Sequence, residues 1–267
     1  MLELIALAAL SATPTTIQSA LSEAKPGDSI TLAPGDYGTV IIRNRHWPQR
    51  VTLNAFGARL RLVIQNSSGI HVNGGTFGPS MDGSGYAAQV QASKDVTFYK
   101  SAFVKSKRGL VIDRSQRVKV SHSRFSGMII DGVNIASSQH VTVSNVVCDG
   151  FTTGEAHPDC VQGWSRPGGI TSDILVEKVT LNGAGVQGIF FGNHVRNGVN
   201  DGGYDRIVIR NNSITGSYPQ GIGLYECRNC EVAGNRVVTL PGSKHRVSIN
   251  IVGGSVKAEN NTVGAKP

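Results

Sequence analysis

The chain has 267 residues, a formal net charge of +8 and a pI of about 9.5. The excess of positive charge predicts an acidic partner. With only 6% aromatic residues and no known binding motif, that partner is not expected to be nucleic acid. No apolar stretch is long enough to cross a membrane, so membrane insertion is not expected. Because the composition shows no break and no linker, we expect one elongated domain.

The first 14 residues have two interpretations. Residues 4–12 are apolar and end in small side chains, like the core of a signal peptide, but Met1-Leu2-Glu3 is acidic rather than cationic. The segment is therefore either the remnant of a signal peptide or the first strand of the fold. The main domain is expected to span residues 15–267.

Residues 15–24 are predicted to form a short helix. Ile17, Leu21 and Ala24 fall on one helical face, and Pro26-Gly27 ends the pattern. A helix of this kind would cap the open apolar end of a repeat protein.

A phrase of eight residues recurs eight times between residues 70 and 263. Positions 1, 3 and 8 are apolar, and positions 1 and 3 alternate like one face of a strand. The copies begin at Ile70, Val96, Val118, Val141, Ile174, Ile207, Cys230 and Val256. Such a period, without helical periodicity between copies, indicates a solenoid. We therefore predict an all-β, single-stranded right-handed parallel β-helix of about nine or ten coils.

Two further rows follow from the same alignment. Position 6 contains Ser101, Ser123, Val146, Val179, Asn212, Asn235 and Asn261, whose polar members are expected to hydrogen-bond along the axis. A second strand family begins at Arg108, Asp131, Asp159, Gln187 and Gln220. Four of these five strands have glycine second, where we expect the chain to turn a corner.

The four cysteines leave their pairing open. Cys148 and Cys230 fall at inward positions, which predicts small buried apolar side chains. Cys227 and Cys230 form a lone C-x-x-C, for which a local disulfide is an alternative and zinc is not expected.

The opening and the coils together resemble a known superfamily. Thr16-Ile17-Gln18, Ala24-Lys25-Pro26-Gly27-Asp28 and residues 30–37, followed by the repeats, are similar to right-handed β-helix proteins of the pectate-lyase-like superfamily. The resemblance covers essentially the whole chain. It implies secreted or periplasmic action on polysaccharide, often acidic polysaccharide. It does not imply one reaction, because lyases, hydrolases, epimerases and non-catalytic domains share the fold.

A narrower similarity lies in the middle of the chain. Asp131-Gly132 and Pro158-Asp159-Cys160 resemble the Asp-Gly and Asp-Asp-Cys motifs of polygalacturonase-type hydrolases. Pro158 replaces the first aspartate of the second motif, which is the general acid of that family, and Gln187 replaces the histidine of a third motif.

The residues themselves suggest a site on the second strand family. Adjacent coils are about 4.8 Å apart, so Asp131 and Asp159 are expected to approach closely. Carboxyls at this spacing suit a glycosidase, and each of two close carboxylates raises the proton affinity of the other. The alternative is a structural ladder in which Arg108 neutralises Asp131. Asn134 and Gln162 are expected to lie beside the pair and bind substrate.

The segment 154–162 interrupts the coil with a long turn and brings His157 close to Asp159. Histidine suits acid–base work because it titrates near neutral pH. The oxygen-bearing residues near His157, which are Glu155, Asp159 and Asp131, would suit Ca²⁺ as a cofactor. The alternative is a loop whose polar groups only satisfy the backbone.

Basic residues are concentrated between residues 105 and 124: Lys105, Lys107, Arg108, Arg114, Arg117, Lys119 and Arg124. A basic stripe near the carboxyls would attract a polyanion and neutralise a uronate carboxylate. Lys105 and Lys107 are predicted substrate-binding residues. A solvated charged face is the alternative.

Two insertions follow second-family strands, at residues 164–173 and 192–206, and are expected to rise from the same edge of the coil. His194 and Arg196 in the second insertion are further substrate-binding candidates. The combined prediction is an exported, monomeric lyase that cleaves a uronate-containing polysaccharide by β-elimination. In it His157 or a nearby basic residue accepts the proton, and Arg108 with Lys105 or Lys107 neutralises the carboxylate. Asp131 and Asp159 orient the site or hold Ca²⁺. A glycoside hydrolase and a non-catalytic glycan-binding or structural β-helix are the alternatives.

Overall fold

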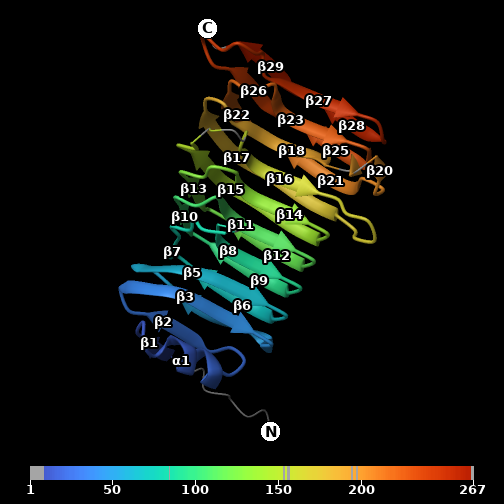
Figure 1. The fold of residues 1–267 in the computed structure, drawn as a ribbon. Helices are drawn as coiled ribbons and strands as arrows, with labels where there is room; N and C mark the ends of the chain where they lie inside the picture. Colours follow the sequence, from blue (N-terminus) through green and yellow to red (C-terminus); the bar gives the residue numbers. More distant parts are fainter. Residues whose placement is uncertain are drawn as a thin grey trace.

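The structure, a computed structural model, describes residues 9–83, 85–152, 154, 157–193, 195–196 and 198–265. Within this part, 27 strands join into one continuous sheet that winds along a single axis, and almost every pairing is parallel (Figure 1). The predicted parallel β-helix is therefore confirmed. Its strands stack in three columns, which we call first, second and third.

The first column contains positions 1 to 4 of the repeated phrase. Val96 pairs with Val118 and Val118 with Val141, as the alignment of copies requires. Its strands are β1 (Ala9–Ala12), β2 (Ser29–Leu32), β4 (His46–Asn54), β6 (Ser68–Asn73), β9 (Lys94–Tyr99), β12 (Gln116–Ser121), β15 (Gln139–Asp149), β17 (Ser172–Gly183), β21 (Tyr204–Arg210), β24 (Cys227–Arg228), β25 (Cys230–Ala233) and β28 (Val256–Glu259).

The second column contains the second strand family. Its strands are β3 (Gly35–Arg43), β5 (Ala58–Gln65), β8 (Tyr86–Gln91), β11 (Arg108–Asp113), β14 (Asp131–Ala136), β16 (Asp159–Trp164), β18 (Gln187–Asn193), β23 (Gln220–Tyr225) and β27 (Ser248–Val252). The register of this column places Arg108, Asp131 and Asp159 side by side, with no slip from the sequence alignment.

The third column contains position 8 of the phrase. It is formed by the start of β5, by the ends of β15 and β17, and by β7 (Thr76–Phe77), β10 (Ala102–Val104), β13 (Arg124–Ser126), β22 (Ser213–Gly216), β26 (Arg236–Thr239) and β29 (Thr262–Ala265). Position 8 faces the core. Phe103 and Phe125 are both buried and stack with ring centroids 4.4 Å apart.

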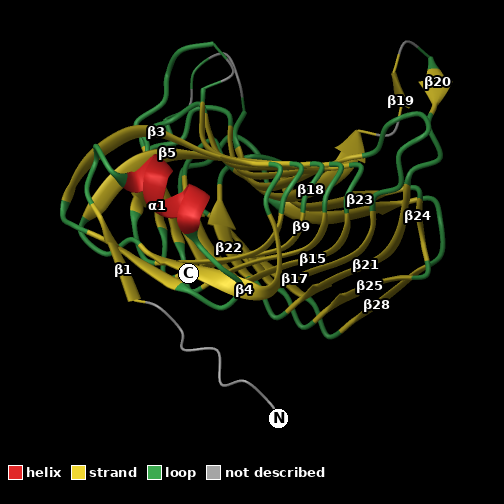
Figure 2. Cartoon of the chain, turned by 90° about the horizontal axis from the view of Figure 1, so that it is seen from below, coloured by secondary structure: helices red, strands yellow, loops and turns green. Residues whose placement is uncertain are grey.

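Helix α1 (Ile17–Glu23) lies where the sequence predicts a cap. Its residues Ile17 and Leu21 are buried against the first coils. Seen along the axis, the helix lies over the end of the stack (Figure 2). Strand β1 pairs in parallel with β2, so residues 9–12 form a strand of the first coil, whereas residues 1–8 lie outside the described part.

The glycines that stand second in β11, β14, β18 and β23 lie inside strands rather than in the turns between columns. Gly109 and Gly132 lie inside β11 and β14 without positive φ. A Cβ atom at Gly109 would lie 2.4 Å from the ring of Phe125, and one at Gly132 would lie 2.6 Å from the carbonyl oxygen of Cys160. These positions are glycine because they face the position 8 side chain and the next coil, which leave no space.

Two disulfides are present, Cys148–Cys160 and Cys227–Cys230. Cys148 and Cys230 are buried, as their inward positions predict, and Cys227–Cys230 is the local disulfide that the sequence left open. The Cys148–Cys160 bond was not predicted. Cys160 occupies the glycine row and faces the position 8 residue of its own coil, which is Cys148, with Cα atoms 5.8 Å apart. The bond closes the segment 149–159, which carries His157.

Polar ladders run along the axis as predicted. Asn212 donates from its Nδ2 atom to Oδ1 of Asn235 at 2.8 Å, and Asn235 donates to Oδ1 of Asn261 at 2.9 Å. The backbone N–H of Ser101 donates to Oγ of Ser123 at 3.1 Å. The backbone N–H groups of Asn212 and Asn235 donate to the same oxygens, each at 3.0 Å, so the ladders also satisfy backbone groups where strand pairing is interrupted.

Candidate functional site

The second column brings the predicted acid–base residues into one row. Arg108, Asp131, Asp159 and Gln187 are register partners on four consecutive coils. Asn134 and Gln162 form a second row three residues further along, and Nδ2 of Asn134 donates to Oε1 of Gln162 at 3.2 Å. The sequence alignment therefore placed these residues correctly relative to one another.

Asp131 and Asp159 are both buried. Oδ1 of Asp131 accepts the backbone N–H of Asp159 at 3.0 Å, and its Oδ2 accepts Nδ2 of Asn134 at 2.8 Å. The two carboxylate oxygens of Asp159 have no hydrogen-bond partner among the described residues. Asp131 is thus held as an acceptor, whereas Asp159 lacks the donors that would stabilise its charge.

Burial raises the pKa of Asp131 to about 6, against the opposing effect of hydrogen bonds from Asn134 and Asp159 and of the Arg108 charge. Burial also raises the pKa of Asp159 well above its usual value, and the charge of Asp131 raises it further. Of the two buried carboxyls, Asp159 therefore has the greater tendency to hold a proton, because it lacks hydrogen-bond donors and lies beside the charge of Asp131.

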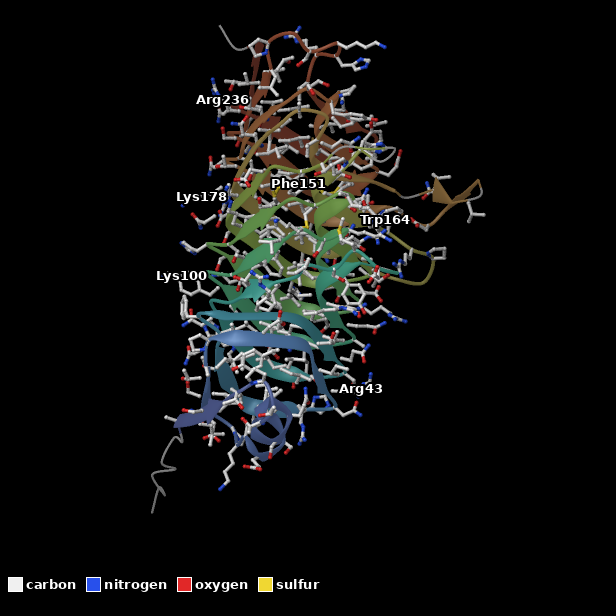
Figure 3. The ribbon with its side chains drawn as sticks, turned by 60° about the vertical axis from the view of Figure 1, so that its left-hand side comes forward. Arg43, Lys100, Phe151, Trp164, Lys178 and Arg236 are labelled. Carbon is white, nitrogen blue, oxygen red and sulfur yellow. A yellow bond between two sulfur atoms is a disulfide. The ribbon has the colours of Figure 1, made fainter. Side chains whose placement is uncertain are left out.

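A cavity of about 320 Å³ lies over the second column across the coils of β8, β11, β14 and β16. We call it the β8–β16 groove. Its lining residues are Tyr86, Gln89, Arg108, Val111, Asn134, Ala136, Trp164 and Arg166. Asn134, which lines it, is held by Asp131. Trp164 lies on the side of the molecule from which the β19–β20 hairpin projects (Figure 3).

Tyr86, Trp164 and Arg166 were missed by the sequence reasoning. Tyr86 is the register partner of Arg108, so one more coil of the alignment would have found it. Trp164 pairs with Ala136 at the end of β16, and Arg166 follows in the inserted loop. For Trp164 and Arg166, the sequence signal was their place at the end of the strand that begins with Asp159 and directly after it.

His157 is exposed and lies two residues before Asp159. Its ring stacks on Tyr218 with centroids 5.0 Å apart. Tyr218 likewise lies two residues before a second-column strand, β23. Glu155 lies outside the described residues.

The basic run of residues 105–124 does not form one stripe, because one coil winds fully around the axis within it. Lys107 and Arg108 lie at the start of the second column, Arg117 at the start of the first and Arg124 in the third. Ion pairs bind Arg114 to Asp113, Arg117 to Asp95 and Arg124 to Asp149. Arg108 alone among these lines the groove.

The neighbouring lysines are placed by the turn before β11. Lys105 is exposed there, and Nζ of Lys107 donates to the carbonyl oxygen of Gly83 at 3.0 Å. Neither lysine lines the β8–β16 groove. Their role in substrate binding stays a prediction.

The two insertions follow β16 and β18 and rise from the same edge of the stack (Figures 1 and 3). The second contains β19 (Val195–Arg196) and β20 (Val199–Asn200), an antiparallel hairpin. His194 lies outside the described residues, and only the backbone of Arg196 is described. The segment carrying His157 lies at the opposite end of β16.

The prediction of Ca²⁺ is not tested. Asp131 and Asp159 are the two predicted oxygen donors that lie among the described residues. Among the described residues, no three His, Cys, Asp or Glu side chains cluster as metal ligands. In the same part of the chain, no helix has the length and apolar character needed to span a membrane.

Comparison with known proteins agrees with this architecture. The sequence model of the family described as "Right handed beta helix region" matches residues 61–237. No curated protein sequence matches the chain.

Solved structures with the same fold are distant in sequence. An alginate lyase from Paenibacillus sp. str. FPU-7 is 17% identical with a TM-score of 0.53, over 97% of this chain and 98% of the other. An endo-xylogalacturonan hydrolase from Aspergillus tubingensis is 11% identical with a TM-score of 0.58, over 97% and 93%. The Dettilon tailspike protein is 13% identical with a TM-score of 0.55, over 92% of this chain but 57% of its own length. At these identities the similarity concerns the fold.

Proposed function

The chain belongs to the right-handed β-helix family, and we propose that it cleaves a uronate-containing polysaccharide by β-elimination. Structures that share its fold include an alginate lyase and an endo-xylogalacturonan hydrolase. The observation that carries this proposal is the β8–β16 groove, which combines the guanidinium groups of Arg108 and Arg166 with the rings of Tyr86 and Trp164. Aromatic surfaces pack against sugar rings, and a guanidinium binds a carboxylate with two parallel hydrogen bonds.

Each residue then has a separate role. Arg108 neutralises the uronate carboxylate, which acidifies the proton on the adjacent carbon. His157, exposed before β16, accepts that proton. The electron pair left on the carbon forms the double bond as the glycosidic C–O bond breaks. The leaving oxygen takes a proton from a water molecule, and the hydroxide so formed takes the proton held by His157. Asp131 positions Asn134 in the groove through its hydrogen bond.

Hydrolysis is the second candidate function. It is favoured by the Asp131–Asp159 pair, in which burial raises the pKa of both carboxyls and the charge of Asp131 raises that of Asp159 further. Such a pair could supply a general acid and a general base. Against it stands the burial of both carboxyls, which separates them from a substrate in the groove.

The product distinguishes the two reactions. The purified protein is incubated with a panel of uronate polymers. Elimination produces an unsaturated sugar end that absorbs in the near ultraviolet, whereas hydrolysis produces only new reducing ends. We expect the absorbing product. Reducing ends without absorbance would support the hydrolase, and binding without any product would support the non-catalytic alternative.

Substitution then tests the assigned roles. His157→Ala should lower turnover by about 10²-fold or more because it removes the proton acceptor. The matched control is His122→Ala, since His122 is also exposed and its ring also contacts a tyrosine, Tyr99, at 5.2 Å. If His157→Ala is as active as the His122→Ala control, His157 is not the base.

Export is part of the proposal. Two disulfides are typical of proteins that fold in an oxidising compartment, which supports secretion or a periplasmic location. The partner we propose is an acidic polysaccharide, bound by a monomer.

A further inference from the structure

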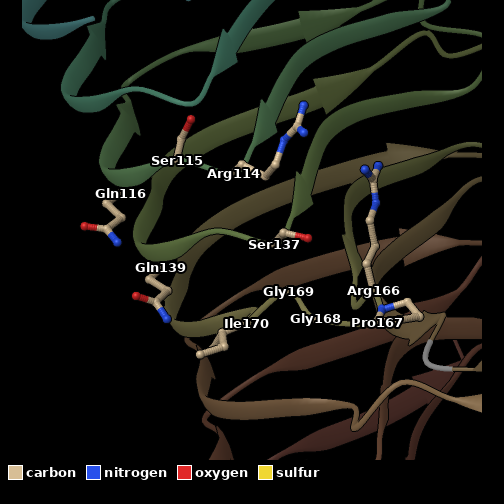
Figure 4. A pocket seen from close by; sticks show the side chains of 10 residues that line it. All are labelled: Arg114, Ser115, Gln116, Ser137, Gln139, Arg166, Pro167, Gly168, Gly169 and Ile170. Atoms are coloured by element: carbon tan, nitrogen blue, oxygen red, sulfur yellow. The ribbon is translucent and has the colours of Figure 1, made fainter. Parts of the chain in front are cut away.

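A second cavity, of about 470 Å³, lies at the edge where second-column strands end. It is formed by the turns of three consecutive coils, after β11, β14 and β16. Figure 4 shows Gln116 and Gln139 one above the other on adjacent coils, with Arg114 and Arg166 extending from the turns nearer the second column. None of the predicted site residues lines this cavity.

One aspartate fixes both arginines. Oδ2 of Asp113 accepts Nε of Arg114 at 3.0 Å, and Oδ1 lies 3.3 Å from Nη1 of Arg166. The side chain of Asp113 is 9% exposed, whereas those of Arg114 and Arg166 are 61% and 44% exposed. The three groups carry a net charge of +1. The remaining guanidinium nitrogens make no hydrogen bond to another described residue, so they can donate to a ligand.

Arg166 also lines the β8–β16 groove, so the two cavities meet at this residue. A sugar chain lying across the second column could therefore continue over the edge of the stack. In the second cavity, the amides of Gln116 and Gln139 offer partners for sugar hydroxyls. The side chain of Ile170, which is 62% exposed, offers an apolar surface.

We propose that this edge cavity is a second anionic-sugar subsite, in which Arg114 and Arg166 bind the negative group of a residue further along the polysaccharide. The inference rests on the proposed function, since it assumes that the same polymer occupies the β8–β16 groove. It adds that the substrate carries negative charge on more than one sugar residue, as a polyuronate does, rather than a single charged residue in a neutral chain.

The test is the length dependence of binding. Calorimetry measures the affinity of a uronate disaccharide and of a longer oligouronate that spans both cavities. Arg114→Gln should weaken binding of the long oligomer about five- to tenfold, as expected for one charge-assisted hydrogen-bonding group, and leave the disaccharide unchanged. Arg108→Gln should weaken both ligands, because it acts in the groove.

The matched control is Arg117→Gln, which removes the same charge from an exposed, ion-paired arginine in the first column. Gln139→Ala serves as a second variant that leaves the Asp113 ion pairs intact, and it should also weaken the long oligomer. A sulfated oligosaccharide of equal length shows whether the subsite selects carboxylates or accepts any anion. Thermal unfolding confirms that each variant is folded.

The outcomes separate the two proposals. If Arg114→Gln and Gln139→Ala match Arg117→Gln at every length while Arg108→Gln weakens binding, the edge subsite is wrong and the groove stands. If Arg114→Gln weakens the disaccharide as much as the long oligomer, the edge cavity is not a separate subsite. If Arg108→Gln has no effect either, the proposed function fails as well.

Discussion

Asp131 and Asp159 bury two carboxyl groups in adjacent strands with only one of them supplied with donors. A buried carboxylate without hydrogen bonds is costly, so the pair retains a proton that an exposed aspartate would lose. The row of residues was evident from the sequence alignment. The raised proton affinity of the pair could not be predicted, because it depends on burial and on which carboxylate oxygens accept hydrogen bonds. Neither follows from strand register.

This pair predicts a specific pH dependence of stability. Both folded pKa values are raised above the unfolded value near 3.8, that of Asp131 to about 6. The folded state therefore binds more protons than the unfolded state, and stability is lost as pH rises through the folded pKa values. Asp159→Asn, which stays neutral, should be more stable than the native chain at pH 7, with the difference shrinking toward pH 4.

Denaturant unfolding at several pH values measures this difference. Each unit of pKa corresponds to about 1.4 kcal/mol, so the effect is well within reach of the method. Asp82→Asn, a change at an exposed position, serves as the charge-matched control and should show no such trend. A variant less stable than the native chain at every pH would contradict a protonated Asp159.

At the scale of the elements, the repeated phrase determines the register of the columns, because every coil must bury positions 1, 3 and 8 together. In the second column, the pairing of Cys160 with Cys148 was not predicted. Its glycine row faces the position 8 side chains, so the departure from glycine at Cys160 pointed to a partner at Cys148. Treating the row as a corner hid that signal.

The disulfide gives a prediction for the segment it closes. Cys148→Val with Cys160→Gly restores the pattern of the other coils, in which an apolar position 8 residue precedes a second-column strand with glycine second, as Ile214 precedes Gly221. Without the bond the unfolded chain gains loop entropy, so the variant should lose about 3 kcal/mol of unfolding free energy under oxidising conditions. Adding a reductant should remove the difference between variant and native chain. A variant as stable as the oxidised native chain would mean that the bond adds no stability.

Other parts of the site could not be predicted from the order of residues. The basic run looked like a stripe because its charges are neighbours in sequence, yet one coil distributes them around the axis. Conversely, Tyr86 and Arg166 lie far apart in sequence and meet in one groove. In a solenoid, a surface is formed by residues about one coil apart, so a charge pattern must be read through the register.

At the scale of the whole molecule, each coil contacts mainly its two neighbours, so stability is a sum of local interfaces rather than of one compact core. This arrangement suits an elongated ligand, because each coil adds one more strand to the second column, beside the strand of the coil before it. It also makes the end of the stack sensitive, since among the described residues it is helix α1 that covers the apolar side of the first coils. Ile17 and Leu21 provide that cover and are buried.

Leu21→Asp should therefore destabilise the molecule from one end. The substitution places an unpaired charge in the interface of α1, which costs several kcal/mol, on the order of 3 to 5, if the helix stays docked. If the helix instead detaches to avoid burying this charge, the strand edges of the first coils become exposed. Hydrogen exchange should accelerate in β1, β2 and β4 while β14 and β16 stay protected, because coupling between coils decays along the stack.

The matched control is Leu175→Asp, which introduces the same change at a half-buried, outward-facing position of the first column in β17. It should leave exchange in β1 and β2 unaltered. Equal acceleration in all coils of the Leu21→Asp variant would show that the solenoid unfolds as one cooperative unit. In that case the second-column groove would depend on the cap for its integrity. Local acceleration would mean that the groove over β8–β16, several coils away, keeps its geometry and its affinity for the polysaccharide when the cap is lost.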